Sequence, residues 1–139
     1  MKKRDVLFAI FGIALILGFM LLPSLRRKAQ SVSCGNYMSS IGLAARIWAG
    51  DNQNTLPSNF IVMSNELATT KVLICPSDNS REAALNWASF TSSNSSYELL
   101  TPGVPYNVSN AFIRCQIHGH LGYADGTVFD GKRRRTKIP

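Results

Sequence analysis

The sequence predicts an α+β protein in which one long N-terminal helix packs on a small C-terminal antiparallel β-sheet. Three observations lead to this prediction. The segment Val6–Leu25 contains twenty residues and no charge. Apolar residues then recur at intervals of three and four as far as Trp48. Short runs of β-favouring residues follow one another after Tyr97, in the last third of the chain.

The uncharged segment Val6–Leu25 has the properties of a membrane anchor. Twenty helical residues extend about 30 Å, which is the thickness of the hydrocarbon core of a bilayer. Lys2–Arg4 precede the segment and Arg26–Lys28 follow it, without the small-residue cleavage site of a signal peptide. We therefore expect residues 1–28 to form a retained, single-pass transmembrane helix. Pro23 should kink this helix rather than end it.

The helix is expected to continue beyond the anchor to about residue 50. Cys34, Met38, Ile41, Ala45 and Trp48 repeat with the period of an amphipathic helix whose apolar side is covered by the rest of the domain. The glycine at position 50 precedes a run of polar residues and can adopt the left-handed conformation of a helix cap. Residues 29–50 are thus predicted to be the helix of a globular domain that spans residues 29–131.

The rest of the globular domain is predicted to consist of short elements. We expect short helices within Val62–Leu67 and Arg81–Trp87. Apolar, β-favouring runs predict three single strands, which are Lys71–Cys75, Tyr97–Leu100 and Ala111–Cys115. The segment Leu121–Phe129 should form a hairpin, because Asp125-Gly126 provides the backbone freedom that a tight turn requires.

Charge and composition exclude several classes of function. The chain has a formal net charge of +7, and residues 132–139 form a basic tail. This tail has no aromatic residues and belongs to no nucleic-acid-binding module, so we expect a solvated terminus and no nucleic-acid partner. Neither a nucleophile–base arrangement nor a paired-carboxylate motif is evident, so we expect no enzymatic activity, no catalytic residues and no cofactor.

Several segments occur together in one class of bacterial protein. A basic, apolar and proline-containing N-terminus leads into an amphipathic helix that begins Cys34-Gly-Asn-Tyr-Met-Ser-Ser-Ile-Gly-Leu-Ala-Ala. Ile74-Cys-Pro-Ser-Asp and the closing Tyr123-Ala-Asp-Gly-Thr-Val follow later in the chain. In these features the chain resembles the type IV pilins and the pseudopilins of type II secretion systems. The resemblance extends to about Phe129 and implies a pilin-like fold.

The resemblance also implies a function and a location. It implies a structural subunit of a secretion or pilus-type filament, with like subunits and assembly proteins as partners. The chain would be held in the inner membrane with its domain in the periplasm, and would become extracellular after assembly. Close packing of the membrane helices would use small residues such as Gly12 and Gly18.

The N-terminus departs from the pattern of this class. Prepilins carry a Gly-Phe-Thr-Leu-Ile-Glu-like site for a prepilin peptidase, whereas this chain has Lys3-Arg4-Asp5-Val6-Leu7-Phe8. Asp5 is the nearest counterpart of the glutamate that serves as a charge partner during assembly. The departure keeps an alternative open, in which the chain is a permanently anchored periplasmic domain that does not polymerise.

The cysteines and histidines form the most site-like set in the sequence. The chain has three cysteines, and an exported domain with an odd count suggests one pair and one cysteine left over. We expect a Cys75–Cys115 disulfide, with Cys34 unpaired. A tetrahedral zinc set of Cys75, Cys115, His118 and His120 is a second possibility. A third is that these residues form neither a disulfide nor a zinc site. A calcium loop at Asp125 and Asp130 is disfavoured, because calcium requires about six or more oxygen ligands.

Overall fold

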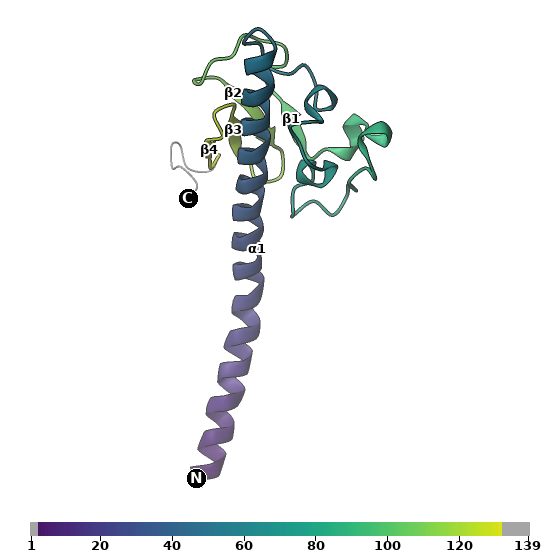
Figure 1. Cartoon of the computed structure of the whole chain (residues 1–139). Coiled ribbons are helices and arrows are strands. Elements are labelled where there is room, and N and C mark those ends of the chain that lie inside the picture. The colour runs from purple at the N-terminus through teal and green to yellow at the C-terminus, as the bar shows by residue number, and fades with distance from the viewer. Residues whose placement is uncertain (1–2, 132–139) are drawn as a thin grey trace.

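The computed structural model describes residues 3–131, with side chains described for residues 11–13 and 15–131. A single long helix, α1 (Lys3–Asp51), is followed by a four-stranded antiparallel sheet, which confirms the predicted α+β class (Figure 1). Four short 3₁₀ helices connect α1 to the sheet: η1 (Ile61–Met63), η2 (Thr70–Leu73), η3 (Trp87–Ser89) and η4 (Ser92–Asn94). The basic tail, 132–139, lies outside the described residues.

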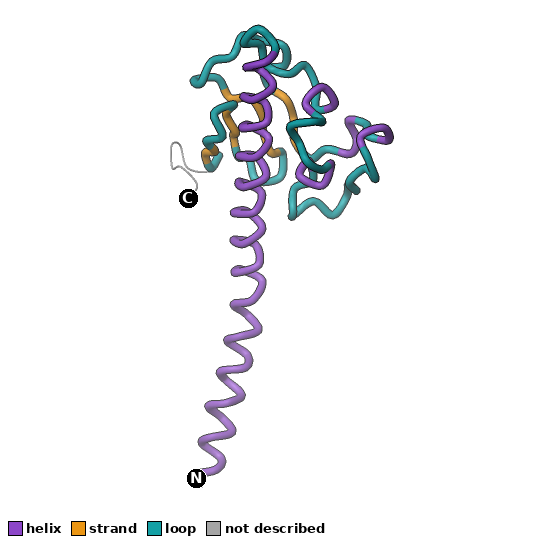
Figure 2. Tube along the Cα trace, in the orientation of Figure 1, coloured by secondary structure: helices purple, strands orange, loops and turns teal. Residues whose placement is uncertain are grey.

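The helix α1 contains 49 residues and continues through Pro23 without interruption, as predicted (Figure 2). It ends at Asp51, one residue beyond the predicted end, but the predicted cap at Gly50 is wrong because Gly50 is still helical. The left-handed conformation falls instead on Gln53 and Asn54, at φ 55° and 56°. The Asn54 N–H donates to the carbonyl of Ala49 at 2.9 Å, so polar residues that tolerate this conformation complete the cap.

Within the described part of the chain, no helix combines the length and the apolar character needed to cross a bilayer. The predicted anchor Val6–Leu25 includes side chains at positions 6–10 and 14, which lie outside the description. The same holds for the side chain of Asp5.

The sheet contains β1 (Tyr97–Leu99), β2 (Ala111–Cys115), β3 (Leu121–Tyr123) and β4 (Val128–Phe129), in that order across the sheet. These strands confirm the C-terminal strands predicted from the sequence. In the first pair of strands, Tyr97 lies opposite Cys115. In the last pair, the expected turn is formed with Gly126 at φ +84°.

The predicted strand Lys71–Cys75 is wrong. Its first part forms the 3₁₀ helix η2, where the Thr69 hydroxyl accepts a hydrogen bond from the Lys71 N–H at 3.3 Å. Leu73 and Cys75 are both fully buried in the core. The run is apolar because it is buried, and a short buried run has no periodicity that separates a strand from a helical turn.

The core lies between the C-terminal half of α1 and the elements that follow it (Figure 1). Cys34, Met38, Ile41 and Ala45 are fully buried, which confirms the predicted apolar stripe on α1. They contribute to one cluster with residues of the loops and the sheet, among them Leu56, Met63, Leu73, Phe112 and Ile113. The stripe therefore holds together segments that are far apart in the sequence.

Gly42 allows α1 to lie directly against the β3–β4 hairpin. A Cβ atom at Gly42 would overlap the backbone carbonyl oxygen of Tyr123 and would lie 3.2 Å from the Gly126 backbone nitrogen. Both neighbours are backbone atoms, so neither can move aside by a simple change of rotamer. The distance between α1 and the hairpin therefore depends on the absence of a side chain at position 42.

We predict that Gly42→Ala lowers the free energy of unfolding by about 1–3 kcal/mol, because the hairpin must move away from α1. Gly50→Ala is the matched control, since a Cβ at Gly50 meets no atom within 4 Å. This control should change stability by no more than about 1 kcal/mol, in the stabilising direction. Thermal and denaturant unfolding of the full chain in detergent measure both effects. Equal stability of the two variants would contradict the described packing.

Candidate functional site

Between Phe11 and Leu25, the described side chains of α1 form an apolar surface that no part of the described chain covers. Phe19 is 79% exposed and Met20 is 74% exposed. More than half of the surface is also exposed at the other large apolar residues of this part of the helix, namely Phe11, Ile13, Leu15, Ile16, Leu17, Leu21, Leu22 and Leu25. Consecutive residues point in all directions around a helix, so the apolar surface surrounds it. A surface of this kind indicates contact with lipid or with other protein.

Gly12 and Gly18, the two glycines predicted to assist helix packing, lie within this uncovered segment of α1. A Cβ at either position meets nothing within 4 Å. Neither glycine is therefore required for packing within one chain.

A second feature is a cluster of three cysteines and one histidine within the globular domain. Cys34 comes from α1, Cys75 from the segment after η2, Cys115 from the end of β2 and His118 from the turn that follows. One ligand atom from each residue lies within 4.8 Å of all the others. The three cysteines are completely buried, and His118 is half-buried. We call these four residues the Cys3His cluster.

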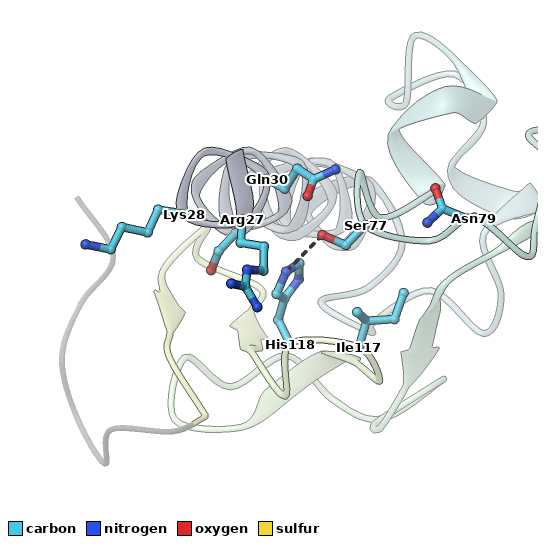
Figure 3. A pocket seen from close by; sticks show the side chains of 8 residues that line it. Arg27, Lys28, Gln30, Ser77, Asn79, Ile117 and His118 are labelled. Carbon is cyan, nitrogen blue, oxygen red and sulfur yellow. Dashed lines mark hydrogen bonds between the residues drawn. The ribbon is translucent and has the colours of Figure 1, made fainter. Parts of the chain in front are cut away.

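The ring of His118 is held between the cysteines and a serine. Its Nδ1 lies 3.3 Å from Cys75 Sγ and 3.8 Å from Cys115 Sγ. Its Nε2 lies 3.2 Å from Ser77 Oγ, on the opposite side of the ring (Figure 3). The His118 backbone N–H also donates to Cys115 Sγ at 3.5 Å, so the Cys115–His118 turn closes on itself.

Hydrogen bonds within the cluster shift the pKa values of its three thiols in opposite directions. Hydrogen bonds from the thiols of Cys34 and Cys75 lower the pKa of Cys115 well below its usual range. Donation to Cys115 raises the pKa of the other two thiols, to about 11 for Cys75 and further for Cys34, where burial acts in the same direction. A buried cluster of three sulfurs thus requires a cation before all three can ionise.

Asp78 organises the turn that carries Cys75. Its side chain is 3% exposed and accepts hydrogen bonds from Ser80, from Ser96 Oγ at 2.7 Å and from Arg81 at 2.9 Å. Ser96 Oγ in turn accepts a hydrogen bond from the Cys75 N–H at 3.0 Å. The carboxylate thereby connects the Cys75 turn to the residue that precedes β1. Burial alone would raise the pKa of Asp78, but these hydrogen bonds outweigh it and hold the pKa well below its usual range.

An open cleft of about 500 Å³ lies beside the Cys3His cluster, where α1 leaves the domain (Figure 3). Arg27, Lys28 and Gln30 of α1 line one side of the cleft, and Ser77 and Ile117 line the other. His118 also lines it and is the member of the cluster that solvent reaches. The cleft therefore connects the buried sulfurs to the surface through the imidazole.

The structure brings together three of the four residues of the zinc set considered from the sequence, and Cys34 takes the place of His120. Cys34, expected to be left over, belongs to the cluster with Cys75, Cys115 and His118. His120 lies outside it and stacks on the ring of His118 at a centroid distance of 5.1 Å.

All three cysteines are free in this structure, so it contains no Cys75–Cys115 disulfide. Both members of that expected pair belong to the Cys3His cluster. Asp125, considered for calcium, accepts hydrogen bonds from the Thr127 N–H and hydroxyl within the β3–β4 turn.

Sequence reasoning overlooked Cys34 because it was assigned only to the apolar stripe of the helix. The available signal was its position as the first residue of that stripe, since a buried stripe faces the rest of the domain.

Comparison with protein-family models, curated proteins and solved structures found no match to this chain.

We predict that Asp78→Asn destabilises the domain by about 2 kcal/mol at pH 7, because the charged acceptor of four hydrogen bonds is lost, two of which are partly buried. The folded-state pKa of Asp78 lies below its unfolded value of about 3.9, so its contribution is complete above that pH and disappears as the pH falls below it. The free energy of unfolding of the variant should therefore fall less than that of the wild type as the pH is lowered.

Glu98→Gln is the matched control, because Glu98 pairs with Arg114 on the surface of the sheet. Denaturant unfolding between pH 2 and pH 7 compares the three proteins. A wild type and an Asp78→Asn variant with parallel pH profiles would contradict the role of the carboxylate.

Proposed function

We propose that this protein is a non-enzymatic structural subunit, pilin- or pseudopilin-like, of a type II secretion or type IV pilus-type filament. The chain would first be anchored in the inner membrane by the N-terminal half of α1, with its domain in the periplasm. It would then assemble through packing of that half against the same helix of other copies. The observation that carries this proposal is the uncovered apolar surface of α1.

The shape of the molecule supports this use of α1. The apolar residues between Phe11 and Leu25 lie on a part of α1 that projects from the domain, whereas from Cys34 onward one side of the helix is buried in it (Figure 1). Within the projecting part, the uncharged segment Val6–Leu25 would extend about 30 Å at 1.5 Å per residue. A bundle of identical helices and a bilayer both cover an apolar surface of this length. Arg26–Lys28 would stand at the boundary between that environment and water.

The continuity of α1 favours a role in assembly. One uninterrupted helix carries both the uncovered surface and the buried stripe of the domain core. Packing between the projecting halves would therefore also set the positions of the globular domains. A domain that serves only as an anchored binding module has no need for this coupling.

A second candidate function is a permanently anchored periplasmic domain that does not polymerise. The specific observation in its favour is Lys3-Arg4-Asp5-Val6-Leu7-Phe8, which has no glycine for a prepilin peptidase to cleave after. Both functions use the same helix and differ in whether it leaves the lipid.

Electron microscopy of the sheared surface fraction, with mass spectrometry of the isolated filaments, tests the proposal. We expect filaments that contain this chain, and the N-terminal residue found in them will show whether Met1 is removed before assembly. An intact chain found only in the inner membrane, under conditions in which surface filaments are present, would contradict the filament role and support the anchored domain.

We also predict that Gly12→Leu and Gly18→Leu each reduce filament yield at least about tenfold by preventing close approach of neighbouring helices. Thermal unfolding of the single chain should not be impaired, because a Cβ at either position would meet no atom within 4 Å. Gly50→Leu is the matched control, since Gly50 also has free space but lies outside the projecting segment. Filaments formed at wild-type yield by both variants would contradict packing through this segment.

A further inference from the structure

We propose that Cys34, Cys75, Cys115 and His118 bind one Zn²⁺ ion as a structural site. Three thiolate sulfurs and the Nδ1 atom of the imidazole would be the four ligands. This inference rests on the Cys3His cluster alone and does not depend on whether the chain forms filaments.

The spacing of the ligand atoms fits tetrahedral zinc. Zn–S bonds of about 2.3 Å and Zn–N bonds of about 2.0–2.1 Å place a sulfur and a nitrogen about 3.6 Å apart in a tetrahedron, and two sulfurs about 3.8 Å apart. His118 Nδ1 lies 3.3 Å from Cys75 Sγ and 3.8 Å from Cys115 Sγ, one distance just below and one just above the ideal sulfur–nitrogen separation. All four ligand atoms lie within 4.8 Å of one another. Only small side-chain adjustments separate this arrangement from a coordination shell.

Two of the sulfurs have a hydrogen-bond donor that is not a ligand atom. The Tyr97 hydroxyl donates to Cys34 Sγ at 3.6 Å. The backbone N–H of His118 donates to Cys115. Donors arranged in this way stabilise thiolates, which are the form that binds metal.

The imidazole is oriented for coordination as well. Ser77 Oγ faces Nε2 of His118, so the proton can reside on Nε2 and donate to the serine (Figure 3). Nδ1 then presents its lone pair toward the sulfurs. Metal-binding histidines commonly have an outer partner of this kind, which determines the tautomer and the orientation of the ring.

The ligand set favours zinc and a structural role. Three soft sulfurs and one imidazole nitrogen in a closed tetrahedron are typical of structural Zn²⁺ sites, and four protein ligands leave no position for substrate. Binding would release the thiol protons and leave a site of net charge −1. Arg27 and Lys28 line the adjacent cleft, which provides both a route of entry and nearby positive charge.

The ion would join three segments that are distant in the sequence. Cys34 belongs to α1, Cys75 to the turn organised by Asp78, and Cys115 and His118 to the end of β2 and its turn. Small domains often depend on such a metal because their cores bury little surface. The proposed zinc would hold the loops after η2 and the sheet against the helix.

The direct test uses the full chain, purified in detergent without a metal-affinity step and under air-free conditions. Elemental analysis should find one zinc per chain, and a chelator should lower the unfolding temperature. Co²⁺ added to the zinc-free chain should produce the absorption of tetrahedral cobalt together with a thiolate-to-cobalt charge-transfer band. Substoichiometric zinc together with the absence of these cobalt bands would overturn the proposal.

Variants identify the ligands. Cys34→Ser and His118→Gln should each abolish stoichiometric zinc binding, whereas His120→Gln, outside the cluster, should retain one zinc per chain. Ser77→Ala should weaken binding about 10–100-fold through loss of the outer partner of His118. Retention of wild-type affinity by Cys34→Ser would contradict the ligand set. Because a ligand variant that unfolds would also lose zinc, the cobalt spectrum of the unmodified chain is the primary measurement.

Peptide mapping after alkylation distinguishes the metal from a disulfide. In the freshly isolated chain, all three cysteines should be protected from alkylation by zinc and become reactive after a chelator is added. A Cys75–Cys115 disulfide in this material would overturn the proposal, because a metal requires both sulfurs as thiolates.

Discussion

Burial of the apolar stripe of α1 is the interaction on which the rest of the domain depends. The strands contain only three, five, three and two residues, and a sheet of this size has little stability of its own. Met38, Ile41 and Ala45 provide the surface on which the sheet and the 3₁₀ helices assemble. The helix contacts η1, η2, β2, β3 and β4, and Cys34 of α1 also accepts a hydrogen bond from Tyr97 of β1. Without this stripe, the short elements would have no common core.

Polar interactions then determine how the loops lie on that core. Asp78 accepts hydrogen bonds from its own turn and from Ser96, which in turn holds the backbone of Cys75. This arrangement directs Cys75 toward α1, where Cys34 begins the stripe, and toward Cys115 at the end of β2. The Cys3His cluster is thus formed where helix, loop and sheet meet, and each contributes at least one ligand atom.

The same helix serves two environments. One side of its C-terminal half is buried by residues of its own chain. Between Phe11 and Leu25, the described apolar side chains are exposed on every side of the helix and none belongs to the core. The first arrangement makes a stable domain. The second is the basis of the proposed role as a filament subunit, in which lipid or the helices of other copies would cover this surface. Since α1 is continuous, the orientation of its N-terminal half in such a bundle or bilayer would also set the orientation of the globular domain.

The sequence by itself determined the features that depend on local periodicity. The spacing from Cys34 to Trp48 identified the helix and its buried side, and Asp125-Gly126 identified the hairpin turn, because both patterns repeat or act over a few residues. Lys71–Cys75 was misassigned because a short buried run has no period. Gly50 was misassigned as the cap because residues other than glycine can adopt the left-handed conformation, which here falls on Gln53 and Asn54. Only the tertiary structure decided that Cys34 joins Cys75, Cys115 and His118 while His120 stacks outside, since these positions are brought together by packing across separations that no local pattern encodes.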